Sequence, residues 1–267
     1  MYQTLLTEVD AGIGIITLNR PERRNAFDDV LIGELAQAID AMAADAGVRV
    51  IVLSSTGKSF CAGADPDWMH RAAAHSDAEN LRDARALAEM LCRLANCPKP
   101  TIARVQGAAY ADGVGLAACC DIAITTFDAQ FALTETRMGL IPAAISPYVI
   151  SAIGERQARR YMLTAERFSA SDAYRLGLVH ELVLDEAALD EAVGEIADTL
   201  LNNGPVALGE CKALISAVAG KPISADVIED TAQRITRLRA SEEGREGIAA
   251  RLEKRKPRWV TGDNPQD

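Results

Sequence analysis

The chain has 267 residues, of which 49% are hydrophobic, and its formal net charge is −10 at pH 7. That length and apolar content are enough to bury one sizeable core. The acidic balance argues against a general nucleic-acid-binding protein, although the run RLEKRKPR at residues 251–258 is a candidate for one local cationic site.

Cysteine usage and hydropathy indicate where the protein works. The six cysteines form no C-x-x-C pair, and Cys119 and Cys120 are neighbours in an apolar segment, which is typical of buried free thiols in a reducing compartment. The N-terminal MYQTLLTEVDAG lacks the charged and apolar regions of a secretory signal, and no apolar run reaches membrane-spanning length. We therefore expect a soluble, cytoplasmic protein without a membrane partner.

The first part of the chain predicts a hairpin, a helix and a buried strand. Residues 4–9 and 13–19 are strand candidates separated by the turn Asp10-Ala11-Gly12. Asp28 or Asp29 can cap a helix with apolar residues at helical spacing, and the next buried strand is expected at 48–54. A turn of small residues follows at 56–65, where a ligand can approach the backbone closely. The polar segment behind it, 70–77, is expected to be mobile.

The stretch 100–142 carries the features on which the chemistry depends. Strands rich in β-branched residues are predicted at 101–105 and 122–126, on either side of a helix at 113–120. With a further helix at 77–94, this order is typical of an α/β fold with parallel strands. The turn Ala111-Asp112-Gly113 leads into helix 113–120, whose first N–H groups lack intrahelical partners and can hold negative charge. Glu135 is a lone acid just downstream.

From residue 142 onward the pattern is mainly helical, with one short strand at 178–184. Helices are predicted at 173–176 behind a cap at 169–172, and at 186–201, 205–217, 224–238 and 241–254. We divide the chain into an α/β core at 1–200 and a C-terminal helical region at 201–267. The apolar stripes of the last helices pack either on this core or on a neighbouring subunit.

Motifs of other enzyme classes are weak or missing. Residues 113–118 fit the loose dinucleotide fingerprint G-x-G-x-x-A, but they lie in mid-chain and leave the 56–65 turn without a role. The sequence contains no G-x-S-x-G elbow and no G-x-x-x-x-G-K-[ST] loop. His70, His75 and His180 have no ligand spacing, so we expect no metal site.

The two small-residue turns offer another chemistry. If the N–H groups of Ala64 and Asp112 converge, they form an oxyanion hole for a carbonyl oxygen that gains charge, as a thioester carbonyl does. A nearby carboxylate such as Glu135 can then move protons or activate water. Taken singly, FCAGAD is equally explained as a tight turn, GVG as a helix start and Glu135 as a surface acid.

Four blocks together resemble the crotonase, or enoyl-CoA hydratase/isomerase, superfamily. They are LNRPERRNAF (18–27), GKSFCAGAD (57–65), QGAAYADGVGLAACCDIAI (106–124) and FALTETRMGLIP (131–142). The resemblance implies an α/β fold with a crotonase-like spiral of ββα turns and a C-terminal helical trimerisation region. It also implies acyl-CoA thioester substrates, no cofactor beyond the CoA of the substrate, and homotrimers that usually pair into hexamers.

The resemblance also implies site residues by position. The oxyanion donors are the backbone N–H groups of Ala64 and Asp112, and Glu135 matches a catalytic glutamate of the family. The residues expected to contact CoA or the acyl group are Arg24, Ala26, Ala62, Ala64, Asp65 and Trp68, together with Lys254, which is expected to reach the CoA phosphate of a neighbouring subunit.

Two departures from the family pattern affect the chemistry. Gly115 stands where two-glutamate hydratases carry their first glutamate, so one catalytic glutamate remains and we expect Glu135 to act alone. The missing side chain at Gly115 is expected to leave room for water or a branched acyl group. Asp112 stands where the oxyanion glycine is usual; its N–H remains, while its carboxylate narrows the acyl pocket, serves as a second acid, or caps the helix.

The subfamily blocks FCAGADPDWM and LIPAAISPYVI are similar to those of methylglutaconyl-CoA hydratases and of the isohexenylglutaconyl-CoA hydratases of terpene degradation. This similarity implies hydration of a branched or glutaconyl-type 2-enoyl-CoA in fatty acid or branched-chain acyl-CoA catabolism, with Arg137 or Arg71 facing the second carboxylate. Pro66-Asp67 replaces the family's Leu-Asn. An enoyl-CoA isomerase, which needs one base, and a non-catalytic CoA-thioester binder remain the alternatives.

Overall fold

The chain builds two β-sheets by moving repeatedly from one to the other. The computed structural model describes residues 2–260. The larger sheet has the order β1 (Leu5–Asp10), β2 (Ile13–Leu18), β3 (Val50–Ser55), β5 (Thr101–Val105), β7 (Ile122–Thr126) and β10 (Glu181–Val183). The smaller sheet has the order β4 (Ser59–Cys61), β6 (Ala108–Tyr110), β8 (Gln130–Ala132) and β9 (Phe168–Ser169).

Successive strand pairs are followed by helices, which produces a spiral. β3 leads to β4, β5 to β6 and β7 to β8, and the helices that follow these pairs include α3 (Asp77–Ala95), α4 (Asp112–Cys119) and α5 (Ser146–Thr164). Only β1 on β2 and β9 on β8 pair antiparallel among the described strands. The predicted hairpin and the ββα spiral of an α/β fold are therefore confirmed.

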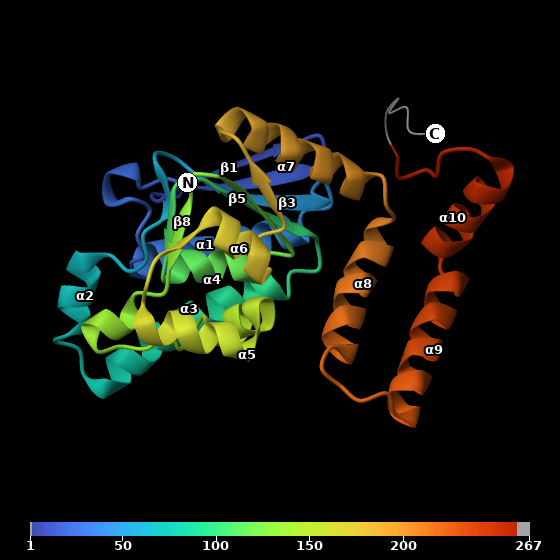
Figure 1. Ribbon diagram of the computed structural model, residues 1–267. Helices are drawn as coiled ribbons and strands as arrows, with labels where there is room; N and C mark the ends of the chain where they lie inside the picture. The colour runs from blue at the N-terminus through green and yellow to red at the C-terminus, as the bar shows by residue number, and fades with distance from the viewer. Residues whose placement is uncertain (1, 261–267) are drawn as a thin grey trace.

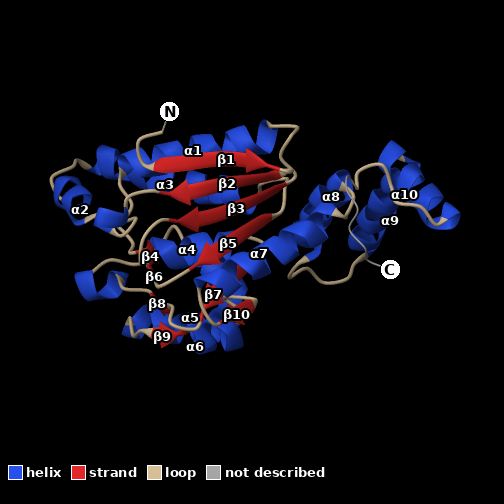
Figure 2. Ribbon diagram, turned by 90° about the horizontal axis from the view of Figure 1, so that it is seen from above, coloured by secondary structure: helices blue, strands red, loops and turns tan. Residues whose placement is uncertain are grey.

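The larger sheet is covered on both faces, which explains its β-branched sequence. In β3, Ile51 and Leu53 belong to the main core, whereas Val50 and Val52 pack in a second cluster with α7 (Glu186–Leu201). This division follows the alternation of side chains along a strand. Figure 2 shows α1 (Asp29–Ala44) and α3 on one face of the sheet.

Several helices begin directly after a residue whose side chain caps the helix N-terminus. The Asp28 side chain accepts a hydrogen bond from the N–H of Leu31 at the start of α1, as predicted. Ser76 and Glu79 form a capping box at the start of α3. Ser169 forms another at α6 (Ala170–Leu176), which begins earlier than the predicted 173–176.

The structure differs from several local expectations. Residues 66–72, which overlap the segment expected to be mobile, form helix α2 (Pro66–Ala72), because Asp65 caps its first N–H groups and proline is tolerated in a first turn. The mobility of this segment stays a prediction. The 56–65 turn contains the short strand β4, and the strand expected at 178–184 shortens to β10. Cys92 and Cys211 are exposed, although the other four free cysteines are buried as expected.

The C-terminal helices lie beside the body of the molecule, beyond α7 (Figures 1 and 2). They are α8 (Pro205–Val218), α9 (Ala225–Ala240) and α10 (Glu242–Glu253). Within residues 2–260, no residue of α8 or α9 is buried, and α10 buries only Ala250. Large apolar side chains exposed on these helices are Val206, Ile215, Ile228, Ile235, Ile248 and Leu252.

The boundary between 200 and 201 lies at the end of α7 and stays a prediction, with residues 261–267 of the proposed region outside the described part of the chain. None of the helices described within residues 2–260 is both long and apolar enough to cross a membrane.

Candidate active site

The parallel strands of the smaller sheet bring three parts of the candidate site to one edge. β4, β6 and β8 run parallel, so their carboxyl ends meet at the same side. The turn around Ala64 follows β4, Asp112 follows β6, and Glu135 begins the short 3-10 helix η2 (Glu135–Met138) after β8. The N–H of Ala111 donates to the carbonyl of Ala132 at 2.8 Å, which holds the last two of these chain segments together.

The turns around Ala64 and Asp112 are in direct contact. Gly63 has a φ of +90°, and a Cβ added there would lie 2.9 Å from Cβ of Ala111. A Cβ added at Gly113 would lie 2.5 Å from the carbonyl oxygen of Cys61. Both glycines therefore permit a close approach of two backbones, as the oxyanion hypothesis requires.

The backbone hydrogen bonds orient the Ala64 N–H. Phe27 donates to the carbonyl of Gly63 and accepts from the N–H of Asp65, both at 2.7 Å. Because the two residues that flank Ala64 make these bonds, its own N–H points to the opposite side. The Ala64 N–H therefore points away from Phe27 and can donate to an acceptor on the other side of the turn.

Asp112 is the first residue of α4 rather than its cap. The N-cap is Ala111, which has φ 49° and ψ −111° and makes no side-chain capping bond. A positive φ is strained for alanine, and such strain occurs frequently at functional turns. The cap interpretation of Asp112 is therefore wrong, and its N–H belongs to the first helical turn, which has no intrahelical acceptor.

Glu135 and Asp112 are both partly buried, and the charge of Glu135 acts on the carboxyl group of Asp112. Burial raises the pKa of Glu135, and its buried Oε2 has no hydrogen-bond partner within residues 2–260. Burial, and then the charge of Glu135, raise the pKa of Asp112 to about 7. These are properties of acid–base groups that work near neutral pH.

Gly115 leaves no open space for water or an acyl branch, contrary to expectation. A Cβ added there would lie 2.2 Å from Cγ2 and 2.8 Å from Cβ of Ile145. Ile145 is buried and fills this position, as close packing requires. The role of Ile145 was missed because no local pattern joins residues 115 and 145.

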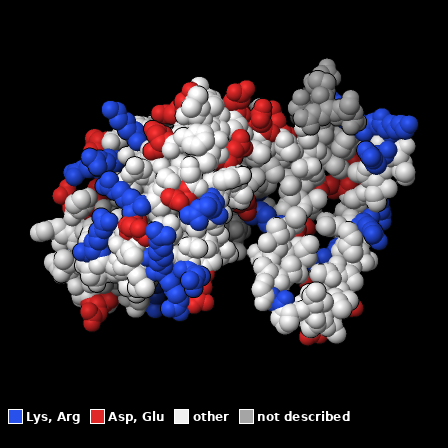
Figure 3. All heavy atoms as spheres, viewed as in Figure 1, with Lys and Arg blue, Asp and Glu red and all other residues white. Residues whose placement is uncertain are grey.

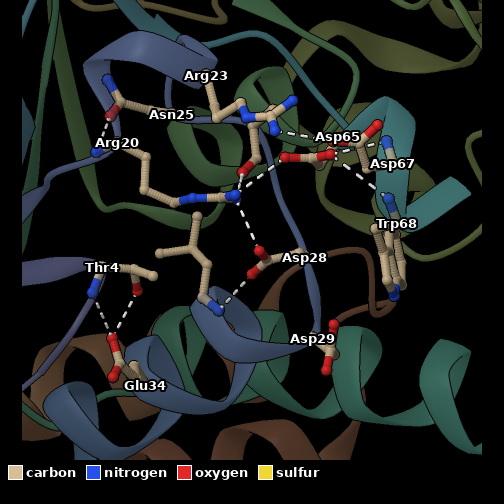
Figure 4. Close-up of polar contacts among 12 residues, drawn as sticks. Thr4, Arg20, Arg23, Asn25, Asp28, Asp29, Glu34, Asp65, Asp67 and Trp68 are labelled. Carbon is tan, nitrogen blue, oxygen red and sulfur yellow. Dashed lines mark hydrogen bonds and ion pairs between the residues drawn. The ribbon is translucent and has the colours of Figure 1, made fainter.

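Arg20 joins the residues around the Ala64 turn (Figure 4). Its guanidinium forms ion pairs with Asp28 and Asp65, each at 3.0 Å, and donates to the carbonyl of Ala26 at 2.6 Å. Asp65 also accepts from the first N–H groups of α2. Burial acts to raise the pKa of Asp65, but these hydrogen bonds and Arg20 together lower it. The carboxylate of Asp65 and the carbonyl of Ala26 thus have structural partners, although their contact with CoA stays a prediction.

The remaining predicted CoA contacts fall into two groups. Arg24 is exposed and accepts at its carbonyl from the N–H of Ala62 at 3.0 Å, while Trp68 on α2 packs against the main core. Lys254 is exposed and follows the last residue of α10, with φ 54°. Helices α10 and α2 lie at opposite ends of the molecule (Figures 1 and 2). A role for Lys254 therefore requires another subunit.

The two candidate arginines differ in their surroundings. Arg137 lies on η2, two residues after Glu135, and donates to the carbonyl of Ala165 at 2.6 Å. Arg71 forms a surface ion pair with Asp29 at 3.1 Å, and both side chains are more than half exposed. Of the two arginines, Arg137 is the one that shares a short helix with Glu135. No cluster of three or more His, Cys, Asp or Glu side chains in the described residues is arranged to hold a metal ion.

Comparison with known proteins agrees with this geometry. The family described as Enoyl-CoA hydratase/isomerase matches residues 8–262. An enoyl-CoA hydratase structure from Shewanella pealeana is 42% identical, with a TM-score of 0.94 and 97% of each chain covered. Pseudomonas aeruginosa AtuE is 39% identical, with a TM-score of 0.93, covering 97% of this chain and 100% of the other. The 2,3-dehydroadipyl-CoA hydratase of Escherichia coli is 32% identical, covering 91% of this chain and 93% of that protein.

Proposed function

Because the chain belongs to the enoyl-CoA hydratase/isomerase family, we propose that it adds water across the double bond of a 2-enoyl-CoA thioester. The N–H groups of Ala64 and Asp112 hold the thioester oxygen as the enolate forms. Glu135 exchanges protons with the water and the α-carbon. CoA is bound along Arg24, Ala26, Ala62, Asp65 and Trp68.

One observation carries this proposal: after β8, at the strand ends where the two turns meet, Glu135 has a buried carboxylate oxygen without a partner among residues 2–260. A buried polar atom without a partner is costly in a purely structural role. A water molecule or the α-carbon of a bound thioester gives it a function. A non-catalytic CoA binder has no need for this group.

The preferred substrate in this proposal is a branched or glutaconyl-type thioester with a second carboxylate, such as methylglutaconyl-CoA or isohexenylglutaconyl-CoA. Arg137, two residues after Glu135 on η2, is the proposed partner of the second carboxylate. The name of the Escherichia coli relative describes a CoA thioester of a dicarboxylic acid. An arginine is well suited to bind such a group, because its planar fork matches a carboxylate.

The proposed working form is a homotrimer or a pair of trimers, in which Lys254 of one subunit binds the CoA phosphate of another. The exposed apolar side chains on α8 to α10 support an interface there. The visible face of α8 and α9 is mostly uncharged (Figure 3). We place the enzyme in the cytoplasm, in fatty acid or branched-chain acyl-CoA catabolism, since free thiols suit a reducing compartment.

The test offers the purified protein straight-chain, branched and dicarboxylic 2-enoyl-CoA thioesters. Hydration removes the absorbance of the conjugated thioester and yields a 3-hydroxyacyl-CoA, with the dicarboxylic thioester preferred. A shifted double bond without added water would identify an isomerase instead. Binding without any product would identify a CoA-thioester binder.

A further inference from the structure

We infer that Asp112 and Glu135 form one acid–base unit that shares a single proton, and that the Asp112 side chain supplies the second carboxyl group of the reaction. The inference rests on the proposed hydration. It gives Asp112 a role beyond its N–H and replaces the expectation that Glu135 works alone.

The backbone places these two residues together. They follow β6 and β8, which are parallel neighbours with Tyr110 opposite Ala132. The Ala111–Ala132 hydrogen bond continues that pairing to the residue before Asp112. Asp112 caps no helix, and Glu135 keeps a buried oxygen without a partner in the described chain. Each carboxyl group interacts with its own backbone N–H, and the second oxygen of Glu135 is the one without a partner in the described residues.

Electrostatics favours one proton on the pair. Two carboxyl groups that interact in a partly buried site resist ionising together, so they titrate as a unit. The pKa of Asp112 is raised to about 7 by burial and by Glu135, and burial raises the pKa of Glu135 as well. The pair therefore keeps one proton until the pH approaches about 7, the range in which acid–base catalysis is most effective.

The groups that face the pair from neighbouring elements do not neutralise it. On β4, Cys61 lies near Asp112, and burial raises the pKa of its thiol, which keeps it uncharged. On η2, Arg137 donates to the Ala165 carbonyl. On α3 and α5, Cys92 and Tyr148 interact with Cys119, at the opposite end of α4.

Sharing one proton balances the reaction. The ionised carboxylate takes a proton from water while the water oxygen bonds to the β-carbon. The electron pair of the double bond moves toward the thioester, whose oxygen gains the charge held by the N–H groups. The protonated carboxyl then gives its proton to the α-carbon as the enolate collapses. After the reaction the shared proton is on the other residue, and its transfer between the two carboxyl groups restores the starting protonation state.

If Asp112 supplies a second carboxyl group at the start of α4, the chain does not need a carboxyl group at position 115. Ile145 occupies the space that a side chain on Gly115 needs. Asp112 lies one helical turn earlier on α4, at the helix start that contacts the Ala64 turn.

The test compares the parent with Asp112→Asn, Asp112→Gly and Glu135→Gln. Asp112→Asn keeps the size and the N–H, and Asp112→Gly restores the family's usual oxyanion residue. Both should lower kcat by about 10²–10⁴-fold with little change in KM. The parent should lose activity at alkaline pH as the shared proton leaves, and Asp112→Asn should lack that alkaline limb.

Infrared titration of the carboxylic-acid band gives a readout that needs no activity. The parent should titrate near the Asp112 value of about 7, and Glu135→Gln should move that midpoint to lower pH by removing the neighbouring charge. An unmoved midpoint, or Asp112 variants with parental kcat and pH profile, would overturn the inference. If the parent hydrates no substrate, hydration itself is wrong, and the infrared titration still decides whether the proton is shared.

Discussion

At the scale of single residues, the contact between Gly115 and Ile145 constrains the site most directly. Gly115→Ala places a methyl group 2.2 Å from Cγ2 of Ile145, and overpacking of this kind costs about 1–3 kcal/mol. We expect urea unfolding to show that loss. Gly33→Ala on α1 is the matched control, because its Cβ would meet nothing within 4 Å; it should stabilise the protein by about 0.4–1 kcal/mol. Equal stability of the two variants would contradict the packing described for Ile145.

Arg137 makes a residue-scale prediction about substrate preference. Arg137→Met should raise KM for a dicarboxylic enoyl-CoA by about 10–100-fold, since a hydrogen bond to a charged group contributes about 1.5–3 kcal/mol. It should leave KM for an uncharged straight-chain thioester near the parent value. Arg71→Met, whose side chain pairs with Asp29 at the surface, should change neither constant. Loss of the dicarboxylic preference in Arg71→Met alone would transfer the role to Arg71.

At the scale of elements, Arg20 links the start of α1, the start of α2 and the Ala64 turn (Figure 4). Arg20→Met leaves Asp65 buried without its cation, and breaking a buried pair in this way costs about 3–5 kcal/mol. Chemical denaturation at neutral pH should show this loss together with a lower kcat. Arg23→Met should cost less than about 1 kcal/mol, because its pair with Asp67 is exposed.

The pH dependence of the stability lost in Arg20→Met identifies Asp65 as the source of that loss. The pKa of Asp65 is lowered in the folded state, so its contribution is fully present above the ordinary aspartate pKa of about 4 and is lost as the pH falls through the lower folded value. The stability gap between parent and Arg20→Met should therefore narrow as the pH falls below about 4. A gap that stays constant to acid pH would assign the loss to packing.

The sequence predicted the long elements and missed the short ones for a physical reason. β3, β5 and β7 carry runs of β-branched residues, and α1, α3 and α7 have helical periodicity, so local pattern was sufficient. β4, β6 and β8 have three residues each, too few for any periodicity. Their pairing comes from the spiral itself, which is why the smaller sheet could be expected only through the family resemblance.

The same limit applies to the site. Ala64, Asp112 and Glu135 were identified because small-residue turns and a lone acid are visible in sequence, and parallel strands place them at one edge. Two features of the site depend on side chains that are distant in sequence. Ile145 occupies the space beside Gly115, and the charge of Glu135 acts on Asp112. Arg20, in contrast, had a signal in the block LNRPERRNAF that the prediction did not use.

At the scale of the whole molecule, the separate helices α8 to α10 bear on assembly and on CoA binding. If Lys254 binds the 3′-phosphate of CoA in another subunit, the parent should bind a CoA thioester more tightly than its 3′-dephospho form. Lys254→Gln should bind both forms equally, while sedimentation shows an unchanged oligomer. Equal binding of both forms by the parent, or a monomer in solution, would contradict this role.

The proposed hydration depends on the carboxylate of Glu135, so the rate of water addition by Glu135→Gln is the measurement that decides it. Glutamine keeps the size of the side chain but cannot accept a proton. The variant should bind acyl-CoA with parental affinity while the loss of conjugated-thioester absorbance slows by about 10²–10⁴-fold or more. Parental turnover by Glu135→Gln, with 3-hydroxyacyl-CoA still formed, would contradict the account.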